Sequence, residues 1–162
     1  MILPGWLLLI AACSTARAIF PVVRVMEITT IVDAGPLIGW FNAADQWHKW
    51  SISVLSKRRG ALHTTEIVLG EACWHLGGNT QPVHALLDLV RKHALVMARP
   101  WPDHLADAQR IMLKYPAMDA ADASLVVLAE MSPNAAVVST DRRDFESCRG
   151  LRNRPLRVIL PE

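Results

Sequence analysis

The sequence predicts an α/β fold in three layers, α/β/α, with a central parallel sheet of about four or five strands. Short runs of β-branched residues alternate with longer segments in which apolar residues recur at helical spacing. The 162 residues are 52% hydrophobic and 20% charged, which suits one domain with a single core and excludes a disordered chain. Because strands separated by helices pair through right-handed crossovers, the sheet is expected to be parallel.

The first strand is expected over Ile28–Val32, a run of β-branched residues that leads into Asp33. Gly35 and Pro36 break this strand, and the apolar segment that follows is expected to form a short helix over 35–43. Asp33 would therefore lie at the carboxyl end of a strand, where α/β sheets bind ligands. The alternative role for Asp33 is to cap the next helix.

A second helix is expected over 46–57, capped by Asp45 and closed by basic residues that suit its dipole. A phosphate contact is the alternative role for these basic residues, Lys57 to Arg59. A brief strand over 61–64 comes next. The helix over 65–76 is expected to end at two glycines, 77 and 78, because glycine is favoured just past a helix C-terminus.

A further helix over 81–93 leads to a strand over 95–98. Pro102 and Asp103 are expected to start a helix that runs to Lys114, because Pro is favoured in the first turn. The residues expected on its core face are Leu105, Ala108, Ile111 and Met112.

The last elements expected are a helix over 119–131, a β-branched strand over 135–140 and a final strand over 156–160. The strand over 135–140 leads into Asp141, just as the first strand leads into Asp33. Two strands of the sheet are thus predicted to deliver a carboxylate to the same edge.

Residues 1–25 differ from the rest of the chain. An apolar block over 6–12 resembles a signal peptide, but no Lys or Arg precedes it and it is too short to span a bilayer. Met26 stands two residues before the first expected strand. We expect a misassigned start codon, an export signal being the alternative, and hence a cytoplasmic protein with no membrane association and a domain over 26–162.

The net charge of +2 does not by itself indicate nucleic-acid binding. Outside residues 1–25, which hold Arg17 and Arg24, 15 of the 17 basic residues remain against 15 acidic residues. Binding of nucleic acid would then depend on local basic patches or on bound metal. The three cysteines are far apart and lack metal-ligand spacing, which indicates a reducing compartment.

Other carboxylates lie on two of the expected helices. Glu71 lies in the middle of a helix among apolar residues, where it either reaches solvent or is held by a cation. Asp119 and Asp122 are three residues apart on the first turn of another helix, where the dipole is expected to lower their pKa values. Asp119 suits a capping role, whereas Asp122 is the better metal ligand of the two.

Carboxylates that converge in one notch would raise each other's pKa values unless a divalent cation neutralised them. Oxygen donors without clustered His or Cys select Mg²⁺, with Mn²⁺ able to substitute. Two such ions suit the hydrolysis of a phosphodiester. Asp144 follows Asp141 and is expected to cap a short helix.

Four segments, VDAGPLIGWF, TTEIVLGEACWHL, MDAADASLVVLAE and VVSTDRRDF, together resemble the PIN-domain family, in particular the VapC-like toxins of bacterial type II toxin–antitoxin systems. The resemblance covers residues 26–162. It implies a Mg²⁺-dependent endoribonuclease, a homodimer, and a cognate antitoxin whose C-terminal segment blocks the active-site groove. The metal site that it implies uses Asp33, Glu71, Asp122 and Asp141, with Asp119 and Asp144 nearby.

On this interpretation Asp33 and Asp122 hold the first ion, and Glu71 and Asp141 complete the site directly or through water. Asp119 is a further candidate ligand. The residues expected to position the RNA or a water are Thr140, Arg142 and Arg143, although the two arginines also suit a solvated turn. The alternative is a non-catalytic PIN-like module that binds RNA or protein.

Overall fold

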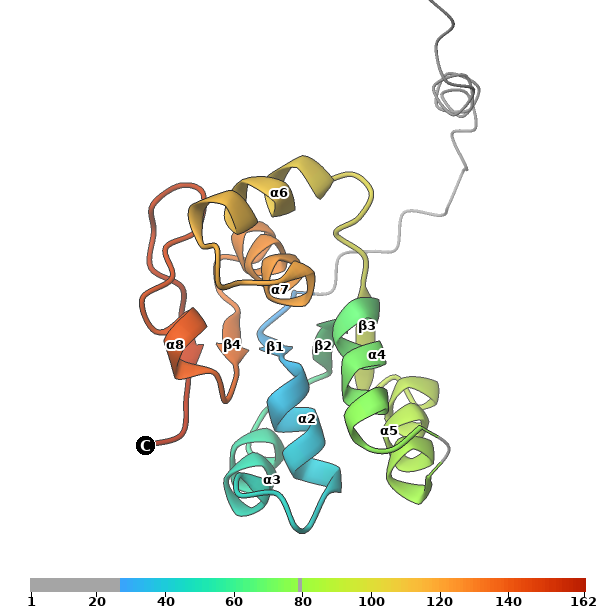
Figure 1. Ribbon diagram of the computed structural model, residues 1–162. Helices are drawn as coiled ribbons and strands as arrows, with labels where there is room; N and C mark the ends of the chain where they lie inside the picture. Colours follow the sequence, from blue (N-terminus) through green and yellow to red (C-terminus); the bar gives the residue numbers. More distant parts are fainter. Residues whose placement is uncertain (1–26, 79) are drawn as a thin grey trace, which may run out of the picture.

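The computed structural model describes residues 27–78 and 80–162 (Figure 1). The prediction of an anomalous extension over 1–25 concerns residues outside these ranges. Five parallel strands form the sheet in the order β3-β2-β1-β4-β5, which confirms the predicted class. Their bounds are β1 (Thr30–Val32), β2 (Leu62–Thr65), β3 (Leu95–Ala98), β4 (Ala136–Val138) and β5 (Val158–Ile159).

Helices connect the strands and cover both faces of the sheet. Figure 1 shows α6 and α7 on one side of the sheet and α2, α3 and α5 on the other, while α4 follows β2 and contacts both α2 and α7. Their bounds are α2 (Ala34–Phe41), α3 (His48–Ser56), α4 (Glu66–His75), α5 (Gln81–Arg91), α6 (Leu105–Lys114), α7 (Ala120–Met131) and α8 (Arg142–Phe145).

The strand order reverses between β1 and β4. The chain builds β1, β2 and β3 in one direction, then crosses over through α6 and α7 and places β4 on the other side of β1. The connections after β1 and β4 therefore leave the sheet in opposite directions, and a crevice opens between them at the carboxyl edge. The parallel register pairs Val32 with Val138, so the residues after these two strands are neighbours.

The helix α7 is the centre of the core. Eight of its residues are buried, from Ala121 to Ala129, because the sheet covers one side of α7 and α6 covers the other. A helix that is apolar on every side is stable only when it is enclosed in this way. The burial of α7 fixes the position of its N-terminal turn, which holds Asp119 and Asp122.

Some local expectations are confirmed and others are wrong. Gly77 and Gly78 adopt positive φ angles of 92° and 70° at the end of α4, as expected of helix-terminating glycines. Asp45 does not cap α3, because its carboxylate accepts the Trp47 N–H at 2.7 Å inside the preceding turn, and the helix begins at His48.

The helix α6 begins at Leu105, later than predicted, because residues 101–104 form turns in which the carbonyl of Pro100 accepts the His104 N–H. On its predicted core face, Ala108 and Ile111 are buried, whereas Leu105 and Met112 are exposed. Only the first two belong to the hydrophobic core. Among the described residues, no helix is long and apolar enough to cross a membrane.

The burial of α7 predicts a large cost for Leu125→Ala. Leu125 is 0% exposed, so the substitution is expected to lower the free energy of unfolding by about 2–5 kcal/mol. Leu113→Ala on α6 is the matched control, because Leu113 is 82% exposed and its loss should cost within about 0.5 kcal/mol. Urea denaturation of both variants checks this, and equal effects would contradict the placement of α7 in the core.

Candidate active site

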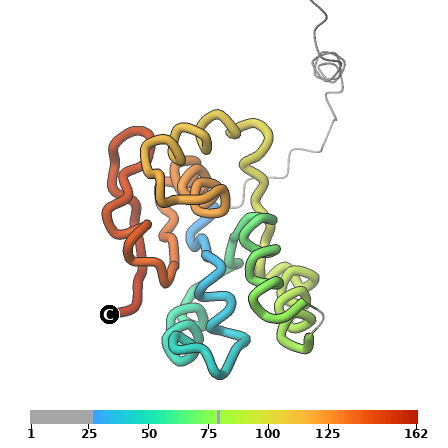
Figure 2. Tube along the Cα trace, in the orientation of Figure 1, coloured from blue at the N-terminus to red at the C-terminus, as the bar shows by residue number. Residues whose placement is uncertain are grey.

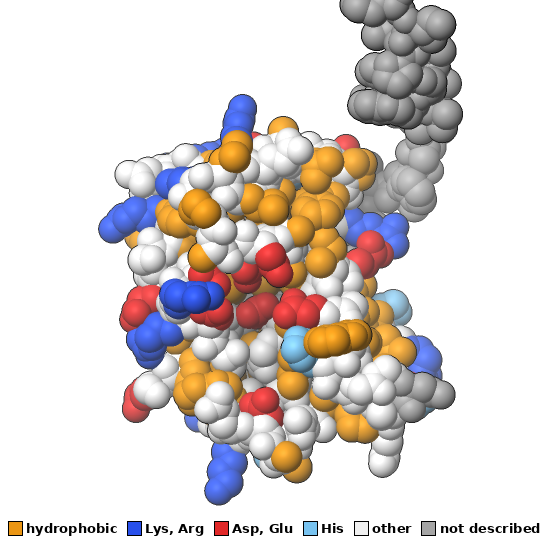
Figure 3. All heavy atoms as spheres, viewed as in Figure 1, with side chains coloured by type: hydrophobic (Ala, Val, Ile, Leu, Met, Phe, Trp, Pro, Cys, Tyr) orange, Lys and Arg blue, Asp and Glu red, His pale blue; other side chains and the backbone are white. Residues whose placement is uncertain are grey.

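Six carboxylates line one cavity of about 340 Å³ at the carboxyl edge of the sheet. They come from the ends of β1 and β4, from α4, from the N-terminal turn of α7 and from α8. Figure 3 shows acidic side chains gathered at the centre of this face, between the two halves of the molecule. The acidic lining residues are Asp33, Glu71, Asp119, Asp122, Asp141 and Asp144.

Asp33 follows β1 and is only 8% exposed. Its Oδ1 accepts the Ala34 N–H at 2.6 Å, which caps α2, and its Oδ2 accepts the Ser139 hydroxyl at 2.6 Å. Burial raises the pKa of Asp33 to about 6, although these two hydrogen bonds act to lower it, and the charges of Glu71 and Asp141 raise it further. Asp33 therefore caps α2, as the alternative interpretation proposed, and it also lines the acidic cavity.

Ser139 is a site residue that the sequence interpretation missed. Its fully buried hydroxyl donates to Asp33 and accepts the backbone N–H of Asp141 at 2.9 Å. The pairing of Val32 with Val138 places Ser139 directly beside Asp33. Only the pairing of β1 with β4 could have revealed it, because the two residues lie 106 positions apart in the sequence.

Asp119 and Asp122 form a capping box at the start of α7. The Asp119 carboxylate accepts the N–H groups of Ala121 and Asp122, and Asp122 Oδ2 accepts the Asp119 N–H at 3.2 Å. The expectation that the helix N-terminus would lower the pKa of Asp122 is wrong. Burial outweighs this hydrogen bond, and with repulsion from Asp33 and other acids it raises the pKa to about 7.

Glu71 is half-buried on α4 and lines the cavity, so simple exposure to solvent does not describe it. Burial raises the pKa of Glu71 and the charge of Asp119 adds to the effect, while nearby His75 lowers it. Of the two possibilities that the sequence left open, solvent exposure or contact with a cation, the structure does not support full exposure, because Glu71 lies among other acidic side chains. Such a group needs a proton or a cation to be stable.

Asp141 and Asp144 share the first turn of α8, but their roles differ from those expected. Asp141 caps the helix by accepting the Asp144 N–H at 3.0 Å. Asp144 is therefore not the cap, and its side chain is buried at the cavity wall. Burial and the charge of Asp141 raise the pKa of Asp144, opposed by Arg143.

Thr140 lies directly over Gly35 at the cavity wall. A Cβ on Gly35 would overlap the Thr140 hydroxyl oxygen, so this glycine is needed for a close approach rather than for an unusual φ angle. The Thr140 hydroxyl makes no hydrogen bond within residues 27–78 and 80–162. It is therefore available to a bound water or substrate.

The two arginines after Asp141 differ in placement. Arg143 lines the cavity and lies 3.6 Å from Asp144. Arg142 instead pairs with Glu146 and donates to the Pro161 carbonyl at 2.6 Å. Arg143 is thus the only basic side chain among the described lining residues, and one guanidinium faces six carboxylates.

The donor set fits a hard divalent cation. All six acidic groups offer oxygen atoms, and no Cys or His lines the cavity among the described residues. Burial, with added repulsion from neighbouring acids, raises the pKa values of Asp33 and Asp122. Over that same part of the chain, no three His, Cys, Asp or Glu side chains stand in an arrangement that could hold an ion. Side-chain rotation would have to complete such a site.

Comparisons with known proteins identify the family and the fold. The family model described as PIN domain matches residues 30–151. The fold resembles that of Mycobacterium tuberculosis VapC20, described as a toxin that cleaves the sarcin–ricin loop, with a TM-score of 0.65, 14% identity and coverage of 72% of this chain and 92% of that one.

The fold also resembles a chain of the DNA-bound VapBC of Salmonella typhimurium, with a TM-score of 0.54, 14% identity and coverage of 82% of this chain and 98% of that one. No match was found among curated proteins. At these identities the likeness to both solved structures concerns the fold alone.

The raised pKa of Asp122 predicts a pH-dependent stability difference. Between its ordinary pKa of 3.8 and about 7, folded Asp122 binds more protons than the unfolded chain does, so this group makes the free energy of unfolding fall as pH rises. Asp122→Asn should therefore become progressively more stable than wild type across this window. The expected gain at neutral pH is about 2 kcal/mol, allowing for partial solvent screening.

Urea denaturation in EDTA at several pH values measures this difference. Asp103→Asn, in the exposed turn before α6, is the control for removal of an acid from the surface. A stability difference for Asp122→Asn that stays constant with pH would contradict the placement of Asp122 in the cavity.

The contact of Thr140 with Gly35 predicts that Gly35→Ala destabilises the fold by about 1–3 kcal/mol. Adding Thr140→Ala should recover most of this loss. Gly70→Ala on α4 is the control, because a Cβ there would contact no other atom within 4 Å. This substitution should raise the free energy of unfolding by about 0.5–1 kcal/mol, since alanine is favoured over glycine inside a helix. Chemical denaturation measures the free energy of unfolding of each variant. If Gly35→Ala were as stable as Gly70→Ala, Thr140 could not lie against Gly35.

Proposed function

This chain belongs to the PIN domain family, whose model spans residues 30–151, and from that premise we propose that it is a metal-dependent endoribonuclease that hydrolyses RNA phosphodiester bonds. The observation that carries the proposal is the cavity at the carboxyl edge, where six carboxylates meet one arginine. A protein that only needed a stable fold would not bury Asp33, Asp122 and Asp144 together, since each burial raises a carboxyl pKa.

We assign Asp33 and Asp122 to the principal metal ion, Mg²⁺ or in its place Mn²⁺. Asp33 follows β1 and Asp122 lies in the first turn of α7, and the charge of Asp33 raises the pKa of Asp122, so the two groups are close enough to interact. Glu71 and Asp141 complete the site directly or through water, and Asp144 joins them as a buried acid at the same wall. Asp119 acts first as the cap of α7 and is a further ligand candidate.

When bound, a divalent ion would activate a water and neutralise charge on the phosphate. The chain's own residues orient the reactants. Ser139 fixes the Asp33 carboxylate, and the free hydroxyl of Thr140 offers a hydrogen bond to the attacking water or to a phosphate oxygen. Arg143 supplies positive charge at the rim for a phosphate oxygen, whereas Arg142 is already paired elsewhere.

We further propose that the protein is the toxin of a type II toxin–antitoxin pair. It would act in the cytoplasm as a homodimer, and a cognate antitoxin would block the cavity. Support comes from the fold that it shares with VapC20, described as a toxin, and with a chain of a VapBC complex. An antitoxin would need a basic side chain to occupy so acidic a cavity.

One observation favours a second candidate, a non-catalytic module that binds RNA or protein. Within the described residues no set of three ligating side chains is arranged to hold an ion. The two candidates differ in whether RNA is cut and in whether the carboxylates are needed.

Cleavage of a total small-RNA pool by residues 26–162 tests the proposal. Wild type with Mg²⁺ should yield discrete fragments, and EDTA should abolish them. Asp122→Asn and Asp33→Asn should each lower the rate by at least about 100-fold, because they remove charge from the proposed ligands without changing shape.

Asp103→Asn, on the exposed turn before α6, should cleave at the wild-type rate. Unchanged cleavage by Asp33→Asn with metal bound as before would reject the ligand assignment. A folded wild type that binds Mn²⁺ but cuts no RNA in the pool would favour the binding module.

A further inference from the structure

Three arginines line a second cavity, which lies at the opposite edge of the sheet from the acidic cavity. Its volume is about 160 Å³, and it lies between the last turn of α7, the residues just before β4 and the segment that leads into β5. Pro133 and Ala135 precede β4 and Arg157 precedes β5, so this cavity is at the amino edge. We call it the arginine pocket, after Arg152, Arg154 and Arg157.

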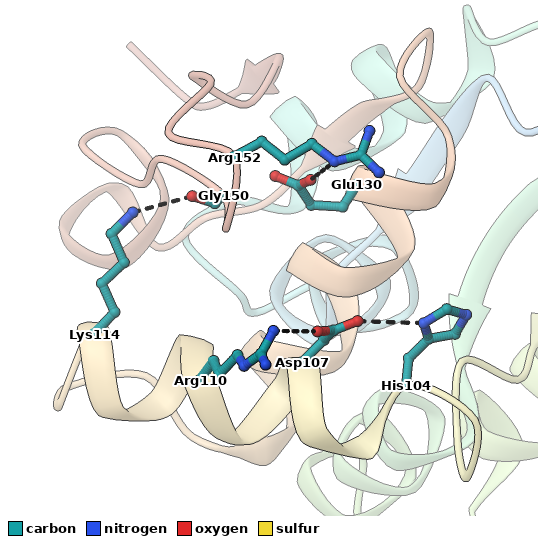
Figure 4. Close-up of polar contacts among 7 residues, drawn as sticks. All are labelled: His104, Asp107, Arg110, Lys114, Glu130, Gly150 and Arg152. Atoms are coloured by element: carbon teal, nitrogen blue, oxygen red, sulfur yellow. Dashed lines mark hydrogen bonds and ion pairs between the residues drawn. The ribbon is translucent and has the colours of Figure 1, made fainter.

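The arginine pocket carries uncompensated positive charge. Its described lining residues include three guanidinium groups and one carboxylate, that of Glu130, so three positive charges less one negative charge leave a surplus of two. The contact between Glu130 and Arg152 spans 3.9 Å, which is too long for a hydrogen bond (Figure 4). Arg157 donates to a neutral acceptor, the Asn134 carbonyl, at 3.1 Å. Arg154 makes no side-chain hydrogen bond or ion pair with any described residue.

The backbone that carries these arginines is held in place. The Gly150 N–H donates to the Arg154 carbonyl at 3.0 Å, and the Arg157 carbonyl accepts the Val137 N–H at 2.8 Å beside the pairing of β5 with β4. Figure 2 shows this last part of the chain, in red, next to the end of α6, where Lys114 donates to the Gly150 carbonyl at 3.0 Å. A backbone that is ordered in advance lowers the entropy lost when a ligand binds.

A larger cavity of about 390 Å³ adjoins the arginine pocket, since Glu130 and Arg152 line both. Figure 4 shows these two side chains above α6, where Arg110 and His104 lie 3.5 and 3.4 Å from the Asp107 carboxylate. The charged groups on α6 are thus paired with one another, in contrast to the arginines. The larger cavity offers space for the organic part of a ligand whose anionic end lies in the arginine pocket.

We propose that the arginine pocket binds a phosphate group, either as free phosphate or as the monoester of a small molecule. A phosphate monoester carries a charge of about −1.5 to −2 at pH 7, which matches the surplus in the pocket. Its several oxygen atoms accept hydrogen bonds from more than one guanidinium at once, whereas a carboxylate has fewer oxygens and less charge. The pocket is large enough, because about 10–15 Å³ already holds a water.

This inference does not depend on the proposed function. The arginine pocket precedes β4, whereas the acidic cavity lies beyond the end of β4, and the two share no lining residue. A phosphate bound in the pocket is therefore a ligand at a separate site and not part of a substrate at the acidic cavity.

The test is a calorimetric titration of the full chain with inorganic phosphate. EDTA keeps divalent ions out of the acidic cavity, and added sodium chloride holds the ionic strength constant. Arg154→Gln/Arg157→Gln removes two guanidinium groups of the pocket. The matched control is Lys57→Gln/Arg59→Gln at the end of α3, which removes two exposed charges that make no side-chain hydrogen bond or ion pair with described residues.

Wild type should bind one phosphate per chain with a Kd of about 1 mM or lower. The double pocket variant should raise the Kd at least about 10-fold, because two charge-assisted hydrogen bonds to the ligand are lost. Arg154→Gln alone should raise it at least about 3-fold, and the control variant should leave it unchanged. Glu130→Gln removes the competing carboxylate and should lower the Kd by about 3-fold or more, a gain that damage to the fold would not produce.

A folded wild type without saturable phosphate binding would overturn the inference, and so would equal Kd values for the double pocket variant and the control. Acetate that binds as tightly as phosphate would also overturn it, because the pocket would then select any small anion. Adenosine monophosphate distinguishes the two sources of the phosphate group. A Kd about 10-fold lower than that of inorganic phosphate, lost in the double pocket variant, would assign the site to a monoester, and equal Kd values would assign it to free phosphate.

Discussion

The hydroxyl of Ser139 joins the two strand ends on which the acidic cavity depends. It donates to the Asp33 carboxylate and accepts the Asp141 N–H, so one buried atom sets the start of α2 relative to the start of α8. This arrangement exists because β1 and β4 are parallel neighbours in a register that pairs Val32 with Val138. The positions of Asp33 and Asp141 in the cavity wall therefore depend on this strand register as well as on the presence of acidic residues in the sequence.

The acidic cavity destabilises the folded protein, because it keeps carboxylates in surroundings that disfavour their charged form. Burial raises the carboxyl pKa values of Asp33, Asp122 and Asp144, and mutual repulsion raises them further, although Asp33 and Asp122 also accept hydrogen bonds that act to lower them. The surrounding structure holds this unfavourable arrangement through helix caps and through the burial of eight residues of α7. Such local conflict is typical of functional sites in otherwise consistent folds.

Much of the fold was predictable from the sequence, because the β-branched runs and helical spacings are strong local signals. The acidic residues of the cavity were also predictable from the sequence, because each lies next to a strand end or on a helix of clear periodicity. Ser139 and the true role of Asp144 were not, because both depend on which strands are neighbours and on which aspartate caps α8. The pKa of Asp122 was mispredicted because a local dipole argument ignores burial, which only the packed structure determines.

The enclosure of α7 has a geometric consequence. Its first turn carries Asp122 and its last turn carries Glu130, which packs on Gly150 in the segment after α8, so the helix spans from the acidic cavity to that segment. The two residues are separated by about 12 Å along the helix axis at about 1.5 Å per residue. Because eight of its twelve residues are buried, α7 cannot shift along its axis without disrupting the core, so its length fixes the distance between the acidic cavity and the segment after α8.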